Sequence, residues 1–107
     1  MKWNVLMTDT AKSDLREIAL YLYDQSGDAE IAAPFVMELQ EQCLALESFP
    51  ERGAVPKDYV LKALGYRYLT YKHYLIFYMT DVKTQSVSIH AFFNEKADYF
   101  RYMRKRV

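Results

Sequence analysis

The sequence is poor in the residues that build covalent or metal-based scaffolds. Cys43 is the one cysteine among 107 residues, which excludes an internal disulfide and a cysteine-based metal cluster. The three glycines and three prolines are too few for a disordered or linker-built protein. The sequence contains no glycine-rich phosphate loop and no pair of histidines at metal-binding spacing. We therefore expect a reduced, cytoplasmic protein that uses neither a metal nor a cofactor.

Long hydrophobic runs are also missing. The apolar stretch at residues 3–7 is far shorter than the core of a signal peptide, and no segment approaches the roughly 20 apolar residues of a membrane span. The chain does have a hydrophobic fraction of 51%, which is enough to form a core. Its length predicts a single domain, residues 1–107, without contact to a membrane.

The formal net charge is zero, but the charges are unevenly distributed. Residues 1–53 hold four Lys/Arg against ten Asp/Glu, a net charge of −6, and residues 54–107 hold ten against four, a net charge of +6. A polarised molecule can present a basic surface to an anionic partner although its total charge is zero. The other interpretation is that the helices are acidic and the strands basic, with no partner involved.

The first half has the periodicity of one strand and two helices. Residues 2–7 alternate in a way typical of a strand, and Thr8 is suited to cap a helix that extends to about Gln25. The segment Ser26-Gly27-Asp28 breaks that helix. A second amphipathic helix then continues to Phe49-Pro50, and Pro34 within it predicts either a kink or a later helix start.

The second half changes to the alternation typical of strands. Residues 59–64 are compatible with a short strand, and clearer strands are predicted over residues 66–71, 74–80 and 86–93. Residues 97–106 favour a short C-terminal helix. The predicted fold class is α+β, with an N-terminal strand and two antiparallel helices packed on one face of a three- to four-stranded antiparallel sheet. The other sheet face would be open to solvent or a partner.

Several polar and aromatic residues permit a functional or a structural interpretation. His90, near the end of the last strand, is either a general base facing a groove or a polar residue on the solvent side. The tyrosines of the predicted strands either stack on RNA bases beside cations or serve as packing pairs and protein-interface anchors. The basic C-terminus either meets a partner or is a solvated helix end; its cations are Arg101, Arg104, Lys105 and Arg106.

Four segments, in this order, resemble one known family. The first is the Thr8–Ile18 segment with Tyr21, and the second is the Leu-Glu-Ser-Phe-Pro-Glu-Arg-Gly stretch at residues 46–53. The third joins Leu-Gly-Tyr-Arg-Tyr-Leu at residues 64–69 to Tyr-Leu-Ile-Phe-Tyr at residues 74–78. The last is the 92–99 region, with paired phenylalanines and an Asp-Tyr pair. Over almost the whole chain, the sequence resembles the RelE/ParE superfamily of type II toxin–antitoxin toxins.

The resemblance implies a function that composition does not reveal. Family members are toxins that a small cognate antitoxin neutralises, and the pair commonly represses its own operon, so operator DNA would be contacted only through the antitoxin. RelE-like members cleave messenger RNA on the ribosome. ParE-like members instead block DNA gyrase and need no nuclease site. The Tyr-Leu-Ile-Phe-Tyr strand is more similar to the ParE-like branch.

The sequence departs from the nuclease pattern at several positions. Leu75 stands where RelE-type nucleases often carry an arginine, and Lys96-Ala97 stands in place of two arginines. Cleavage of RNA requires a group that activates the ribose 2′-hydroxyl and cations that hold the phosphate. The residues that match these roles are Arg67, His90, Lys96 and Tyr99.

Three hypotheses stay open at this point. The chain is a toxin that binds a protein target such as gyrase, a ribosome-dependent mRNA endoribonuclease, or a degenerate toxin that serves only as antitoxin partner and co-repressor. For Arg67, the sequence allows either an exposed head that contacts phosphate or a target protein, or a head at the core margin paired with a helix carboxylate.

Overall fold

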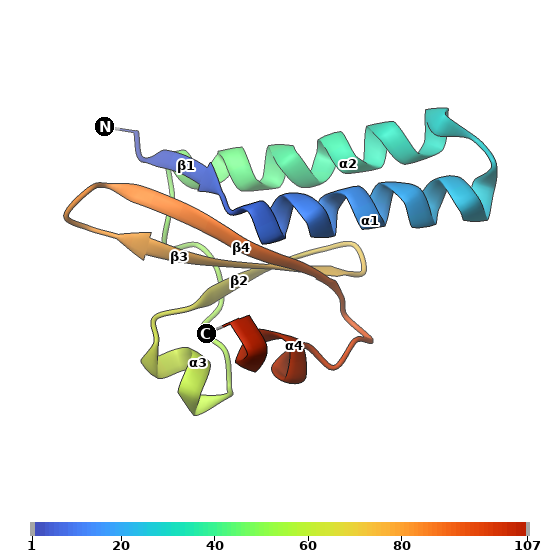
Figure 1. Cartoon of the computed structure of the whole chain (residues 1–107). Helices are drawn as coiled ribbons and strands as arrows, with labels where there is room; N and C mark the ends of the chain where they lie inside the picture. Colours follow the sequence, from blue (N-terminus) through green and yellow to red (C-terminus); the bar gives the residue numbers. More distant parts are fainter. Residues whose placement is uncertain (1, 107) are drawn as a thin grey trace.

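The computed structural model describes residues 2–106 (Figure 1). Its elements follow in the order β1 (Asn4–Met7), α1 (Asp9–Ser26), α2 (Ala29–Leu44), a 3₁₀ turn η1 (Ala45–Glu47), α3 (Tyr59–Ala63), β2 (Arg67–Tyr71), β3 (Tyr74–Asp81), β4 (Ser86–Asn94) and α4 (Tyr99–Arg106). The predicted α+β class, with its N-terminal strand, helix pair and C-terminal helix, is confirmed.

The four strands form a mixed sheet in the order β1-β4-β3-β2. The three C-terminal strands form an antiparallel meander, but β1 runs parallel to β4, with Val5 beside Val87. The predicted antiparallel meander is therefore confirmed with three strands, and the parallel addition of β1 makes the whole sheet mixed. Alternation along a strand predicts which face a side chain occupies and carries no information about the direction of the neighbouring strand.

The α1–α2 hairpin begins and turns where the sequence predicts. The Thr8 side chain accepts a hydrogen bond of 3.1 Å from the Ala11 amide and caps α1. Gly27 ends α1 with a φ of +68°, a left-handed conformation that suits glycine, and its amide donates to the Tyr23 carbonyl. Helix α2 starts at Ala29 and runs through Pro34, so the alternative of a later start is wrong.

One core fills the space between the hairpin and the sheet. Its buried members include Leu15 of α1, Leu39 of α2 and Ile76 of β3. Cys43 also lies here, and burial raises the pKa of its thiol to about 12, which identifies it as a structural residue rather than a nucleophile.

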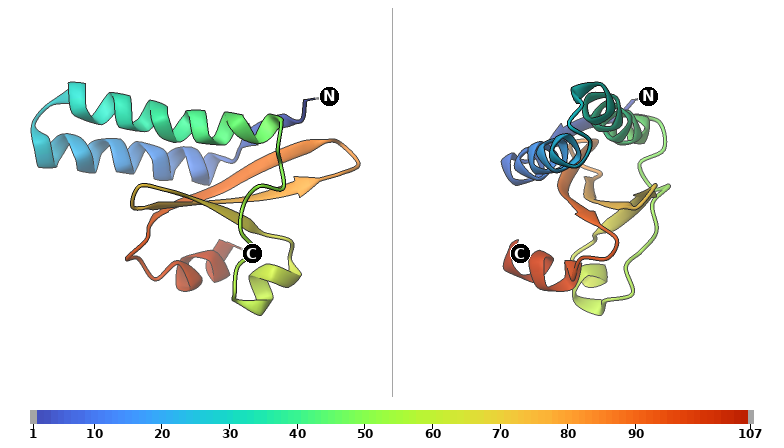
Figure 2. Two further views of the ribbon diagram at one scale, coloured as in Figure 1. Left: turned by 180° about the vertical axis from the view of Figure 1, so that it is seen from behind. Right: turned by 90° about the vertical axis from the view of Figure 1, so that its right-hand side faces the viewer.

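The second face of the sheet is covered as well, so the prediction of an open face is wrong. Helices α3 and α4 lie against it (Figures 1 and 2) and form a second core of Leu61, Tyr66, Leu75, Phe77, Ala91, Phe93 and Met103. The strand predicted over residues 59–64 is a helix, because Asp58 caps it: its Oδ1 accepts from the amides of Val60 and Leu61. The molecule thus has three layers: the hairpin, the sheet, and α3 with α4.

No helix formed by residues 2–106 is both long and apolar enough to cross a membrane.

Candidate functional site

A bulge in β4 places His90 beside α4. Phe77 pairs with Ala91 and Tyr78 with Ile89, which leaves His90 as the extra residue. Its ring meets the Tyr66 ring edge-on, with centroids 5.3 Å apart. Burial, and then the nearby Arg106 charge, hold the pKa of His90 below its usual value, so the imidazole is neutral at pH 7 and is able to accept a proton.

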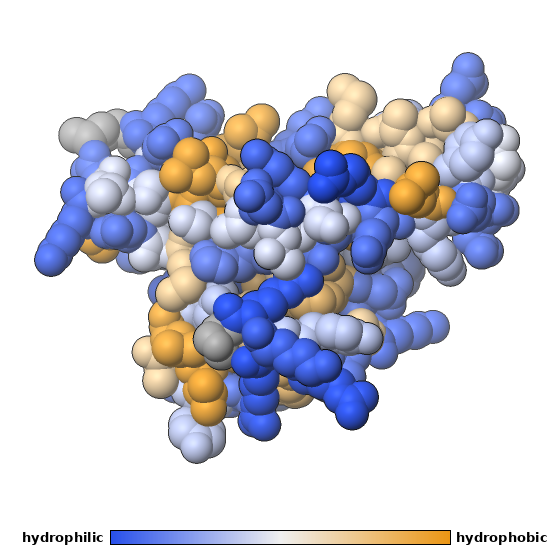
Figure 3. Space-filling view, in the orientation of Figure 1, coloured by the Kyte–Doolittle hydropathy of each residue, from blue (hydrophilic) through white to orange (hydrophobic). Residues whose placement is uncertain are grey.

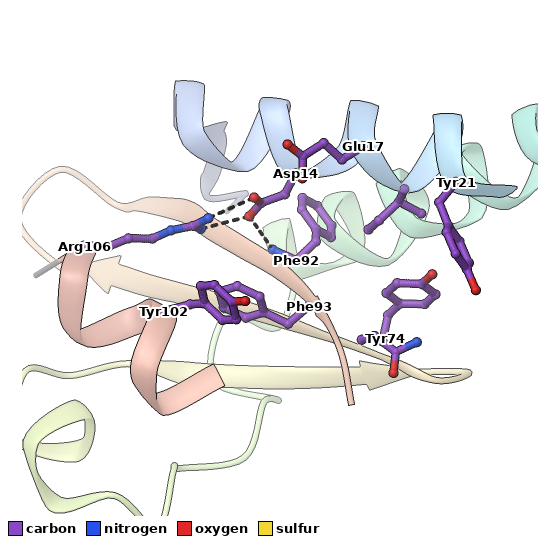
Figure 4. A pocket seen from close by; sticks show the side chains of 10 residues that line it. Asp14, Glu17, Tyr21, Tyr74, Phe92, Phe93, Tyr102 and Arg106 are labelled. Carbon is purple, nitrogen blue, oxygen red and sulfur yellow. Dashed lines mark hydrogen bonds and ion pairs between the residues drawn. The ribbon is translucent and has the colours of Figure 1, made fainter. Parts of the chain in front are cut away.

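An ion pair beside the bulge joins α1 to α4 (Figure 4). Nη1 and Nη2 of Arg106 each donate a 2.8 Å bond to a different carboxylate oxygen of Asp14. Asp14 also accepts a 3.1 Å bond from the Phe92 amide, and Arg106 donates a 3.1 Å bond to the His90 carbonyl. The guanidinium lies over the Phe93 ring, 5.1 Å from its centroid. This fork-to-fork pair therefore connects α1, β4 and α4 at one point.

Arg67 lies at the opposite edge of the sheet and holds a loop. Its Nη1 donates to the carbonyls of Glu51 and Gly53, at 3.2 and 3.0 Å. The Gly53 amide in turn donates a 2.9 Å bond to the hydroxyl of the fully buried Tyr78. The interpretation of Arg67 at the core margin fits, but its partners are backbone carbonyls and not a helix carboxylate.

Lys96 lies in the turn before α4, and Tyr99 is the first residue of that helix. The Tyr99 ring packs on Phe77 and Phe100, with centroids 5.3 and 4.3 Å away. Burial, with smaller contributions from Tyr68 and Asp58, raises the pKa of Tyr99. Lys96 is exposed in the turn after β4.

The four residues proposed for catalysis do not come together. Across residues 2–106, no side-chain hydrogen bond or ring contact joins any two of Arg67, His90, Lys96 and Tyr99. The sequence-based reasoning missed the Asp14–Arg106 pair, because 92 positions separate the two residues and a basic helix end is ordinarily solvated. The one sequence signal was the position of Asp14 within the family-like segment of residues 8–18.

A pocket of about 510 Å³ opens beside this ion pair, between α1 and α4 (Figure 4). Half of its lining residues are aromatic, and it has carboxylates on the α1 side. The lining includes Glu17, Tyr21, Tyr74, Phe92 and Asn94. We call it the α1–α4 pocket.

Charge is segregated between the two outer layers. Residues 8–47, which we call the acidic hairpin, hold nine Asp/Glu against two Lys/Arg. The third layer carries exposed cations, which we call the basic layer: Lys57, Lys62, Lys96, Arg101, Arg104 and Lys105. Figure 3 shows strongly hydrophilic side chains gathered over α4. Of the ten basic residues in the second half, Arg67 is the one that lies in a strand, so the interpretation of basic strands is wrong.

The part of the chain that the structure describes holds no group of three or more His, Cys, Asp or Glu side chains placed to bind a metal ion.

Comparison with known proteins gives the family. Residues 5–99 match the sequence profile described as the ParE toxin of the type II toxin–antitoxin system parDE. The chain belongs to the ParE toxin family. As a ParE-family protein it is the toxin component of a type II toxin–antitoxin system, as the sequence resemblance implied.

Solved structures share the fold of this ParE-family chain. The chromosomal ParDE system from P. aeruginosa aligns with a TM-score of 0.71 at 20% identity, covering 87% of this chain and 96% of that one. The toxin–antitoxin complex RelBE2 from Mycobacterium tuberculosis aligns with a TM-score of 0.62 at 22% identity, covering 88% and 99%. A comparison with curated proteins gives no match.

Proposed function

We propose that this ParE-family toxin arrests bacterial growth by binding a protein target in the cytoplasm, and that the target is DNA gyrase. The observation that carries the proposal is the match to the ParE family over residues 5–99. Resemblance to the ParE-like branch implies gyrase as the target.

The engagement of the candidate catalytic residues supports binding rather than RNA cleavage. Nη1 of Arg67 is already bonded to two backbone carbonyls, those of Glu51 and Gly53. The Tyr99 ring is packed against two other aromatic rings. A nuclease needs several such groups around one phosphate. Here the candidates lie in β2, in β4, in the turn after β4 and in α4, and across residues 2–106 no side-chain hydrogen bond or ring contact joins any two of them.

The aromatic side chains also fit protein recognition better than RNA stacking. Tyr66, Tyr74 and Tyr78 are buried in the two cores, which leaves little of the predicted stacking surface on the strands. The tyrosines with large exposed fractions lie instead on helices, with Tyr59 79% exposed. Exposed tyrosine is a frequent anchor in protein interfaces.

We further propose that a cognate antitoxin neutralises this toxin and that operator DNA is met only through the antitoxin. The two structural neighbours are described as a toxin–antitoxin system and a toxin–antitoxin complex. An acidic, disordered antitoxin segment would be steered to the basic layer on α3 and α4, because opposite charges accelerate encounter.

Inducible expression in a bacterial host tests the proposal, with separate measurements of DNA supercoiling, translation and transcript cleavage. We expect growth arrest and loss of negative supercoiling, with transcripts intact, and recovery when the neighbouring small protein is co-expressed. Transcript cleavage with normal supercoiling would favour the RelE-like alternative, for which the neutral His90 beside Arg106 is the supporting observation. Normal growth at high expression would leave the degenerate-partner alternative.

A further inference from the structure

Within residues 2–106, no strand pairs with the last part of one edge of β4. Strand β1 covers that edge from Ser86 to Ile89 and ends at Met7. The Thr8 amide makes the last bond, to the Ile89 carbonyl at 3.0 Å, and the chain then turns into α1. The final residues of β4, from the bulge to Asn94, therefore lack a strand on this side, although β4 continues to pair with β3 on the other.

The Asp14–Arg106 pair occupies the first position along this uncovered edge. Arg106 donates to the His90 carbonyl, and Asp14 accepts from the Phe92 amide. A residue in a parallel strand beside Ala91 would make the same two bonds, one through its N–H and one through its C=O. The ion pair thus makes the two bonds that one residue of β1 would make if that strand continued along β4.

The next position along the edge faces the α1–α4 pocket. The Glu95 amide donates to the His73 carbonyl at 2.8 Å, and Phe93 pairs with Leu75 of β3. The N–H and C=O groups of Phe93 and Glu95 therefore face β3. By the alternation of an antiparallel pair, the Phe92 carbonyl and the Asn94 amide point the other way. Both residues line the α1–α4 pocket. A single residue of a parallel strand, placed beside Phe93, would bond both groups.

The walls of the α1–α4 pocket indicate which side chain fits at the next residue of the added strand, the one after the residue beside Phe93. Phe92 belongs to the core on the hairpin side and Phe93 to the core on the α4 side, so the residue after the pairing one would face α1. There it would meet Tyr21, Tyr74 and the exposed carboxylate of Glu17. Across residues 2–106, no side-chain hydrogen bond or ion pair engages Glu17, whereas its neighbour Asp14 is neutralised by Arg106. Aromatic walls with a carboxylate at the rim fit a long side chain with a cationic head.

We propose that the α1–α4 pocket binds an extended segment of another protein, which adds to the uncovered end of β4 parallel to that strand and places an arginine or lysine beside Glu17. Recognition has two parts. The backbone of the segment bonds the Phe92 carbonyl and the Asn94 amide, as in other cases of strand addition, and its cation lies between the tyrosines and Glu17. This site is distinct from the basic layer, which attracts acidic partners, and its test does not require the chain to be toxic.

Titration of the ¹⁵N-labelled chain with short peptides tests this proposal by NMR. The probe is acetyl-Thr-Val-Arg-Val-Thr-amide, with two matched control peptides: one has glutamate in place of arginine, and the other has an N-methyl group on the valine before the arginine. The methyl group removes the N–H that would donate to the Phe92 carbonyl and leaves the cation in place. We expect saturable shifts at the Asn94 amide with the probe and neither control peptide reproducing them.

The variant Glu17→Gln should weaken binding of the probe by about threefold, since it removes one charge at an exposed site. Glu41→Gln, on the exposed part of α2, is the matched control and should bind as the original chain does. Absence of saturable shifts at Asn94 with millimolar probe would overturn the proposal. Equal binding of the N-methyl peptide would overturn strand addition, and equal binding by Glu17→Gln would overturn the cation site.

Discussion

Arg67→Ala removes the guanidinium that holds the Glu51–Gly53 loop against the sheet. The 3.0 Å bond to the Gly53 carbonyl is partly buried, and the 3.2 Å bond to Glu51 is exposed. Hydrogen bonds from charged donors contribute about 1.5 kcal/mol when partly buried and less at the surface, so we expect a loss of about 2 kcal/mol in the free energy of unfolding. For a domain of this size the melting temperature should fall by about 10 °C.

Urea unfolding and thermal melting of Arg67→Ala measure this loss directly. Arg67→Lys is the matched control, because it keeps the charge but presents one ammonium group and no planar fork. We expect it to recover at most part of the stability. Toxicity should be measured on the same variants and should fall only as far as the folded fraction does. Loss of toxicity with an unchanged melting temperature would refute the structural role and make Arg67 a residue that contacts the target.

Three further outcomes follow from the packing. Gly53→Ala should lower the free energy of unfolding by about 2 kcal/mol in urea, because the added Cβ would lie 2.5 Å from the buried Tyr78 hydroxyl and 2.9 Å from the Tyr68 carbonyl. Unchanged stability would show that the loop moves freely. In a double-mutant cycle, Asp14→Ala and Arg106→Ala should couple by about 2 kcal/mol, since the two groups form a bidentate, partly buried pair; additive effects would contradict the pairing. Because the pKa of His90 is lowered in the folded chain, the contribution of His90 to stability is present above the ordinary histidine pKa and is lost as the pH falls through the lowered value. NMR titration of the His90 ring measures this pKa, and a raised pKa would contradict the prediction.

The local elements were predictable from the sequence because their signals are local. Thr8 and Gly27 bound α1 through capping chemistry that operates within a few residues. The apolar spacing of α1 and α2 likewise requires no distant partner. The alternation of the meander strands was sufficient to predict their positions to within one or two residues.

The third layer was not predictable in the same way, since its stability comes from contacts distant in sequence. Helix α3 has five residues, and its apolar pattern is as compatible with a strand as with one helical turn. The Asp58 cap decides between them. Whether a helix covers the second sheet face depends on Met103 and on the Asp14–Arg106 contact, whose partners lie at opposite ends of the chain.

The candidate site shows the same limit. Arg67, His90, Lys96 and Tyr99 were selected by their positions in motifs, which say nothing of where a side chain points. His90 is placed beside α4 by the β4 bulge opposite Phe77 and Tyr78, which no residue pattern in the sequence predicts. The uncovered edge of β4 exists because β1 ends at Met7, which depends on the packing of α1.

The most direct test of the proposed function is a supercoiling assay with purified DNA gyrase, ATP and relaxed plasmid, in the presence of this purified chain. If gyrase is the target, the chain inhibits supercoiling in proportion to its concentration, its purified antitoxin restores the activity, and messenger RNA in a translating ribosome reaction stays intact. Full supercoiling at a large excess of the folded chain, together with cleavage of the messenger RNA, would contradict the account and identify a ribosome-dependent nuclease.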